Sequence, residues 1–135
     1  MKNLLTKKNI FYIAIIGTIL YFLFIFSQEI NLCSESQRSC IQMYDSTAEI
    51  FQIFIPMLLI SLAVYKIHGE VYTTWLYFAR WWVPLSMFLV LIAPYGKGDW
   101  MFPHDKGRVS LLMSGLFLFI SLTLIVYKSF KLKKT

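Results

Sequence analysis

Four long apolar runs dominate the chain, at residues 10–27, 47–66, 75–95 and 108–128. Each is close to the roughly 20 residues that an α-helix needs to cross the hydrocarbon core of a bilayer. The composition agrees, because 58% of the 135 residues are hydrophobic and 15% are charged, whereas soluble domains carry about 25% charged residues. The sequence therefore predicts an all-α polytopic membrane protein, one domain of four transmembrane helices in an up-and-down bundle.

The first run has a secretory signal peptide as its alternative interpretation. A cleavable signal has an apolar core of roughly 7–15 residues followed by a small-x-small cleavage site. Here the run is longer and continues into Phe26-Ser27-Gln28-Glu29, which contains no such site. We therefore expect a retained transmembrane helix.

The distribution of basic residues predicts the orientation of the bundle. The net charge is +6, and nine of the 13 Lys and Arg residues lie in the N-terminal tail, the second loop and the C-terminal tail. The positive-inside rule then places both termini in the cytoplasm, and we expect the protein in a bacterial inner (plasma) membrane. The charges form no basic stripe on a soluble element, so the sequence does not favour nucleic acid as a partner.

The second run contains a predicted helix start and a predicted kink. Ser46-Thr47-Ala48-Glu49 has the S-x-x-E form of a capping box, which predicts a helix that begins near Ser46. Pro56 lacks an N–H and frees the carbonyl of Gln52, so the helix should kink there. Gln52 is also the deepest strongly polar side chain of the four runs. It is expected to form a hydrogen bond between helices or, alternatively, to line a transport path.

The third run has an uncertain start. A helix from Trp75 places Arg80 inside the span, whereas a start at Trp81 leaves a short span, with residues 72–80 lying flat in the membrane interface. Arg80 can extend its guanidinium to the headgroups within a belt of aromatic residues. In the third loop, Trp100 is expected to anchor in the interface or to form a docking surface. The predicted interfacial anchors are Arg80, Trp75, Trp81, Trp82 and Trp100.

The fourth run carries a face of small residues. Asp105 is the expected N-cap, and Gly107, Ser110, Ser114 and Ser121 follow at spacings of 3, 4 and 7 residues, which place them on one side of a helix. Small residues allow helices in lipid to approach closely. We expect this face to pack against other helices, and it is the surface through which a protein partner or a homo-oligomer is predicted to bind.

The two cysteines, Cys33 and Cys40, lie in the loop that the predicted topology places outside. Disulfides form and persist there, so we expect the two thiols to pair. The first interpretation is a structural bridge, which stabilises a short loop by about 2 kcal/mol. The alternative is a redox-active pair, although the spacing is C-x6-C rather than C-x-x-C.

The remaining motifs predict no catalytic, cofactor or metal site. His68 and His104 are the only histidines and lie on opposite sides of the predicted membrane, so one chain cannot hold a bis-histidine haem. Gly96-Lys97-Gly98 lacks the rest of a phosphate-binding loop.

Three functional hypotheses follow. The first is a non-enzymatic subunit, scaffold or partner of a larger membrane assembly. The second is a membrane thiol oxidoreductase that uses Cys33 and Cys40. The third is a small oligomeric transporter or channel whose path is lined by Gln52, the Pro56 kink and the serines of the fourth helix.

Overall fold

The computed structural model of the chain describes residues 6–34, 36–67, 69–94 and 105–134. These parts are largely helical and contain no strand. The helices are α1 (Lys7–Ile25), α2 (Arg38–Phe51), α3 (Phe54–Tyr65), α4 (Gly69–Ile92) and α5 (Lys106–Lys133). The prediction of an all-α protein is therefore confirmed.

Four helical rods are long and apolar enough to cross a membrane. Three of them are α1, α4 and α5, and the fourth is the segment Arg38–Tyr65, which contains both α2 and α3. Their outer surfaces carry many exposed apolar side chains, as helices that are apolar on all sides do in a membrane. Examples are Ile16, Leu59, Phe88, Leu111 and Phe119. The prediction of four helices able to span a membrane is confirmed.

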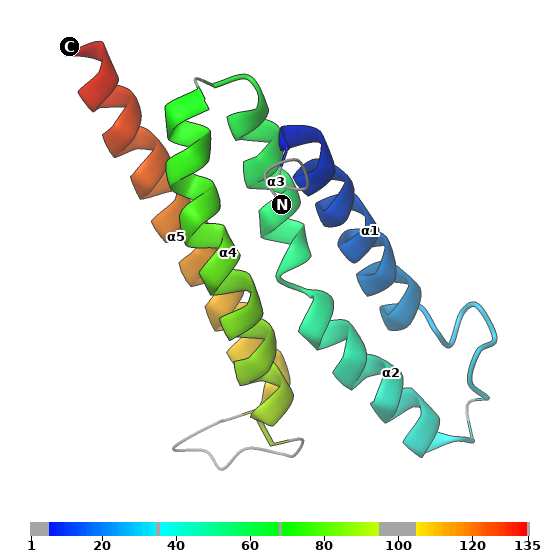
Figure 1. Ribbon diagram of the computed structural model, residues 1–135. Helices are drawn as coiled ribbons and strands as arrows, with labels where there is room; N and C mark the ends of the chain where they lie inside the picture. Colours follow the sequence, from blue (N-terminus) through cyan, green and yellow to red (C-terminus); the bar gives the residue numbers. More distant parts are fainter. Residues whose placement is uncertain (1–5, 35, 68, 95–104, 135) are drawn as a thin grey trace.

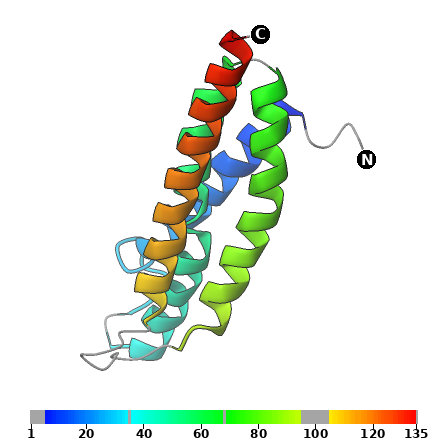
Figure 2. The same cartoon turned by 90° about the vertical axis from the view of Figure 1, so that its left-hand side faces the viewer.

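The two ends of the molecule differ in the residues they gather (Figures 1 and 2). The start of α1, the turn between α3 and α4 and the end of α5 lie at one end, which we call the lysine end because Lys7, Lys66 and Lys131 are there. The loop after α1, the start of α2 and the start of α5 lie at the other end, which we call the disulfide end. Lys7 connects the start of α1 to the turn between α3 and α4, because its ammonium donates a hydrogen bond of 2.9 Å to the carbonyl of Ile67.

The second rod begins earlier than the capping-box pattern predicts. Helix α2 starts at Arg38, so Ser46 and Glu49 lie inside it, and the predicted helix start near Ser46 is wrong. The reason is that residues 38–45 are polar overall but place Ile41 and Tyr44 on the same face as the buried Ala48. Packing of this face against α1 continues the helix beyond the apolar run.

The rod is interrupted between α2 and α3, at Gln52 and Ile53. Pro56 has no N–H with which to reach the carbonyl of Gln52, and that carbonyl instead accepts a hydrogen bond of 3.1 Å from the N–H of Ile55. The shorter ring locally tightens the backbone, and Figure 1 shows the resulting break between the two helices.

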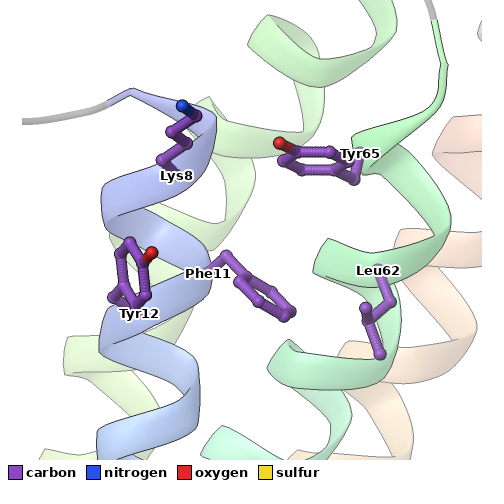
Figure 3. A pocket seen from close by; sticks show the side chains of 5 residues that line it. All are labelled: Lys8, Phe11, Tyr12, Leu62 and Tyr65. Carbon is purple, nitrogen blue, oxygen red and sulfur yellow. The ribbon is translucent and has the colours of Figure 1, made fainter.

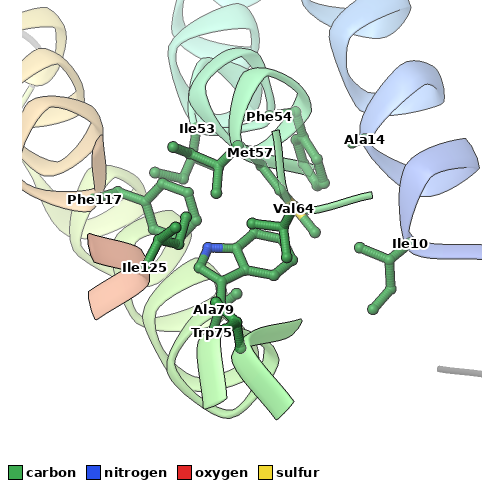
Figure 4. Close-up of a cluster of buried hydrophobic side chains, with 12 residues drawn as sticks. Ile10, Ala14, Ile53, Phe54, Met57, Val64, Trp75, Ala79, Phe117 and Ile125 are labelled. Carbon is green, nitrogen blue, oxygen red and sulfur yellow. The ribbon is translucent and has the colours of Figure 1, made fainter. Parts of the chain in front are cut away.

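The core lies where α3, α4 and α5 meet (Figure 4). Trp75 of α4 occupies its middle, with Val64 of α3 and Phe117 of α5 beside it, and all three side chains are fully buried. The rings of Trp75 and Phe117 meet edge to face, with their centroids 6.5 Å apart. Buried apolar side chains of α1 and α3 extend this cluster toward α1.

Helix α1 contacts α3 closely through Gly17. A side chain at this position would overlap the ring of Phe54, so only glycine fits. One residue further on, the hydroxyl of Thr18 is shared between two carbonyls, that of Ala14 in its own helix at 2.8 Å and that of Phe54 in α3 at 3.3 Å. This contact holds the start of α3 against α1 and thereby places the end of α2 beside α1.

Candidate functional site

Cys33 and Cys40 form a disulfide at the disulfide end, with their Cα atoms 5.9 Å apart. Cys40 lies in the first turn of α2, so the bond ties the loop after α1 to the start of that helix. Cys33 is 5% exposed and therefore shielded from reagents in solution. Cys40 is half-buried, and both the structural bridge and the redox-active pair stay predictions.

A recess of about 340 Å³ lies between α1, α2 and α5, on the disulfide side of the break in the second rod. Most of its polar lining comes from α2. Helix α1 contributes the aromatic side chain of Tyr21, and α5 contributes Gly107, which has no side chain. Its lining residues are Tyr21, Ile25, Asp45, Ala48, Glu49, Gln52 and Gly107. Two carboxyl side chains and one amide side chain thus share this cavity.

Glu49 is the central polar residue of the recess. Its Oε2 atom is buried and has no hydrogen-bond partner among the described residues. Its Oε1 atom lies against α5, where a Cβ atom added to Gly107 would be 3.0 Å away. The capping-box pattern assigns Glu49 to a helix cap, but α2 extends past it on both sides, so its carboxylate is free to face the recess.

Two hydrogen bonds join α2 to α5 beside this carboxylate. The hydroxyl of Ser110 donates to the backbone carbonyl of Glu49 over 2.6 Å. The ammonium of Lys106 donates to the hydroxyl of Ser46 over 2.9 Å. Lys106 is thus held by a neutral group and forms no ion pair within the described residues, while Asp45 and Asp105 add negative charge near Glu49. The charge of Lys106 offsets part of this negative charge at Glu49.

Gln52 lies on the same side of α2, one turn after Glu49, and lines the recess. Its side chain makes no hydrogen bond with another described residue. The hydrogen bond between helices expected for it is therefore not formed within the described chain. Its alternative role, lining a path for a solute, stays a prediction.

The small face of α5 packs inside the chain itself. Ser110, Ser114 and Ser121 are 2%, 8% and 0% exposed, and Gly107 is half-buried against α2. The hydroxyl of Ser121 accepts a hydrogen bond from the indole of Trp75 in α4. This face does meet other helices, as predicted, but they are α2 and α4 of the same chain. These small residues are thus covered within the chain, and binding of a partner through α5 stays a prediction.

The predicted interfacial anchors occupy three kinds of position. Arg80 is exposed, and so is Trp81, at 75%. Trp82 is half-buried and donates its indole N–H to the carbonyl of Met113 over 3.3 Å. Trp75 is not an interfacial anchor, because its side chain is fully buried in the core. The prediction for Trp100 lies outside the described residues.

The burial of Trp75 has a periodic cause. Val71, Trp75 and Ala79 follow one another at intervals of four residues, and all three are buried on the inner face of α4. The same helix includes residues 72–80 without interruption, so this segment is not a separate interfacial element. Helix α4 begins at Gly69, earlier than either predicted start, and the position of Arg80 relative to the membrane stays a prediction.

Comparison of the chain with protein-family models, with curated proteins and with solved structures finds no match. The candidate site therefore rests on its own geometry. The described residues contain no group of three or more His, Cys, Asp or Glu side chains placed to hold a metal ion. A recess with carboxylates and an aromatic wall suits an organic cation instead, because an aromatic ring face attracts alkylammonium groups.

Proposed function

We propose that the chain is an integral membrane protein with both termini in the cytoplasm of a bacterium, and that it binds a small organic cation in the recess between α1, α2 and α5. The observation that carries the proposal is the buried Oε2 atom of Glu49, which has no partner among the described residues and borders a cavity of about 340 Å³. A buried carboxylate without a partner is costly, and such groups within membrane segments commonly mark solute paths.

The lining supports a quaternary ammonium or alkylamine ligand. Tyr21 offers an aromatic ring at one wall, and Asp45 and Glu49 offer carboxylates at the other. Gln52 adds an amide oxygen at the level of the break before α3, where the backbone departs from a regular helix. Of the residues expected to line a transport path, Gln52 borders the recess, whereas Pro56 and the serines of α5 do not.

The test is equilibrium binding of radiolabelled tetraethylammonium to the full chain in lipid nanodiscs. We expect saturable binding by the wild type and a loss of at least tenfold in affinity for Glu49→Gln. The matched control is Glu70→Gln, which removes the same charge from an exposed position at the start of α4, at the lysine end. Equal affinity for the wild type and Glu49→Gln, or no saturable binding at all, overturns the proposal.

A further inference from the structure

A groove of about 320 Å³ runs between α1 and α3 at the lysine end, away from the recess. It is lined by Lys8, Phe11 and Tyr12 of α1 and by Leu62 and Tyr65 of α3 (Figure 3). Apart from one ammonium and two phenol hydroxyl groups, these side chains are apolar. The groove therefore combines an apolar floor with a single positive charge.

The groove opens on the outer surface of the bundle. Tyr12, Leu62 and Tyr65 are 60%, 51% and 46% exposed, so each presents much of its side chain to the surroundings. The ring centroids of Phe11 and Tyr65 lie 6.3 Å apart, and the two rings line the groove between the two helices. In a bilayer, the molecules that contact such a surface are lipids.

The polar and apolar parts of the groove are separated along the helix axes. Figure 3 shows Lys8 above Phe11 and Tyr12 on α1, and Tyr65 above Leu62 on α3. The ammonium of Lys8 and the ring of Tyr65 thus lie toward the end of the molecule, whereas Phe11, Tyr12 and Leu62 lie toward its middle. This is the order of headgroup and acyl chain in one leaflet.

The two neighbouring lysines at the start of α1 have different roles. Lys7 is engaged within the protein, because it donates to the carbonyl of Ile67 and its ammonium lies 5.3 Å from the ring centroid of Tyr72. Lys8 is exposed and forms no hydrogen bond or ion pair with another described residue. Its charge remains available to an anion at the mouth of the groove.

We propose that this groove binds one anionic phospholipid, with an acyl chain along Phe11 and Leu62 and the phosphate at Lys8. Charge complementarity favours an anionic lipid, because Lys8 places an ammonium at the mouth of the groove. A second lysine, Lys66, is the next residue after Tyr65 in the sequence. The cytoplasmic leaflet is the one rich in anionic lipid, and each nearby lysine contributes about 1 kcal/mol of attraction to it. The site is independent of the recess and of its proposed cation.

Native mass spectrometry of the full chain, released from detergent with added lipid, tests this site. We expect phosphatidylglycerol to bind more tightly than phosphatidylcholine with the same acyl chains, and Lys8→Gln to weaken phosphatidylglycerol binding about fivefold. Lys8→Arg should retain the preference. Lys134→Gln, which removes an exposed lysine at the end of α5, is the matched control and should leave the affinity unchanged.

A second variant tests the apolar half of the groove. Leu62→Trp places a larger side chain where the acyl chain is proposed to lie, and it should weaken the binding of both lipids. Since Leu62 is half exposed, the substitution leaves the core intact, and circular dichroism verifies the fold. The proposal is overturned if phosphatidylcholine binds as tightly as phosphatidylglycerol, if Lys8→Gln binds like the wild type, or if inorganic phosphate displaces the lipid.

Discussion

The indole N–H of Trp75 donates a hydrogen bond of 3.1 Å to the hydroxyl of Ser121, and both side chains are fully buried between α4 and α5. Each group satisfies a polar atom that would otherwise lie unpaired in an apolar core. The pair also explains why α5 needs a small hydroxyl residue at this position, because a larger side chain would displace the indole.

Substitution of Ser121 by alanine removes this acceptor and leaves the indole N–H unpaired. We expect Ser121→Ala to lower the free energy of unfolding by about 0.5–2 kcal/mol, since hydrogen bonds between transmembrane helices contribute in this range. The measurement is an unfolding titration with sodium dodecyl sulfate in mixed micelles, followed by tryptophan fluorescence. Ser121→Thr keeps the hydroxyl but adds a methyl group and should be destabilising through crowding.

Three further variants separate the effect of losing the hydrogen bond from the effect of losing the indole ring. Trp81 is exposed on the same helix, so Trp81→Phe should leave the unfolding free energy within about 0.5 kcal/mol of the wild type. Trp75→Phe should destabilise the protein, and Ser121→Ala should then cost less in the Trp75→Phe background. Equal costs of Ser121→Ala in the two backgrounds would show that the bond contributes nothing.

Gly17 permits the closest approach of α1 to α3, and its replacement is the second prediction. An alanine Cβ there would overlap the ring of Phe54, so we expect Gly17→Ala to lower the unfolding free energy by about 1–3 kcal/mol. Gly115 of α5 serves as the control, because a methyl group added there would meet no neighbouring side chain within 4 Å. Gly115→Ala should be neutral or slightly stabilising, because alanine favours helix more than glycine does.

The disulfide gives the third prediction. We expect Cys33 and Cys40 to resist alkylation in native membranes until they are reduced under denaturing conditions, which a mass shift on a non-reducing gel detects. The double variant Cys33→Ser, Cys40→Ser should lose about 2 kcal/mol of stability while it retains its helical content, because the bond closes only a short loop. A mixture of oxidised and reduced chains, or a mixed disulfide with another protein, would instead favour the oxidoreductase hypothesis.

The sequence predicts the four rods well, because runs of about 20 apolar residues leave few alternatives in lipid. It predicts local features less well where one pattern has two meanings. Ser46 and Glu49 match a capping box, but the helix already begins at Arg38. Residues 38–45 contain few apolar side chains, so the sequence pattern gives little indication that they are helical. Trp75 lies near Arg80 and other aromatic residues, which suggests an interfacial belt, while its spacing from Val71 and Ala79 indicates burial.

The recess could not be predicted from any spacing along the chain. It forms because Tyr21, Glu49 and Gly107 come from three helices whose relative rotation depends on tertiary packing. The contact of Gly17 with Phe54 and the hydrogen bond of Ser110 to Glu49 set that rotation. A weaker indication was available: glutamate inside an apolar run is costly, so Glu49 required a structural or functional reason beyond a cap.

Gly107 supplies the fourth prediction, which concerns the recess itself. Its missing side chain leaves room for the carboxylate of Glu49, and a Cβ atom would stand 3.0 Å from Oε1. Gly107→Ala should therefore push the carboxylate aside and weaken tetraethylammonium binding several-fold, without removing any charge. Since the displaced atom ends a flexible side chain, we expect the unfolding free energy to change by less than about 1 kcal/mol.

The comparison with Gly115→Ala separates this effect from a general change in α5, because that variant adds the same methyl group to the same helix in open space. Binding should be normal for Gly115→Ala and weakened for Gly107→Ala, while both fold. A third outcome is normal tetraethylammonium affinity for Gly107→Ala together with weakened affinity for Glu49→Gln. The carboxylate of Glu49 would then bind the cation from a position that a methyl group at residue 107 does not disturb. If neither substitution changes binding, the cation occupies another site, and Glu49 serves only the contact between α2 and α5.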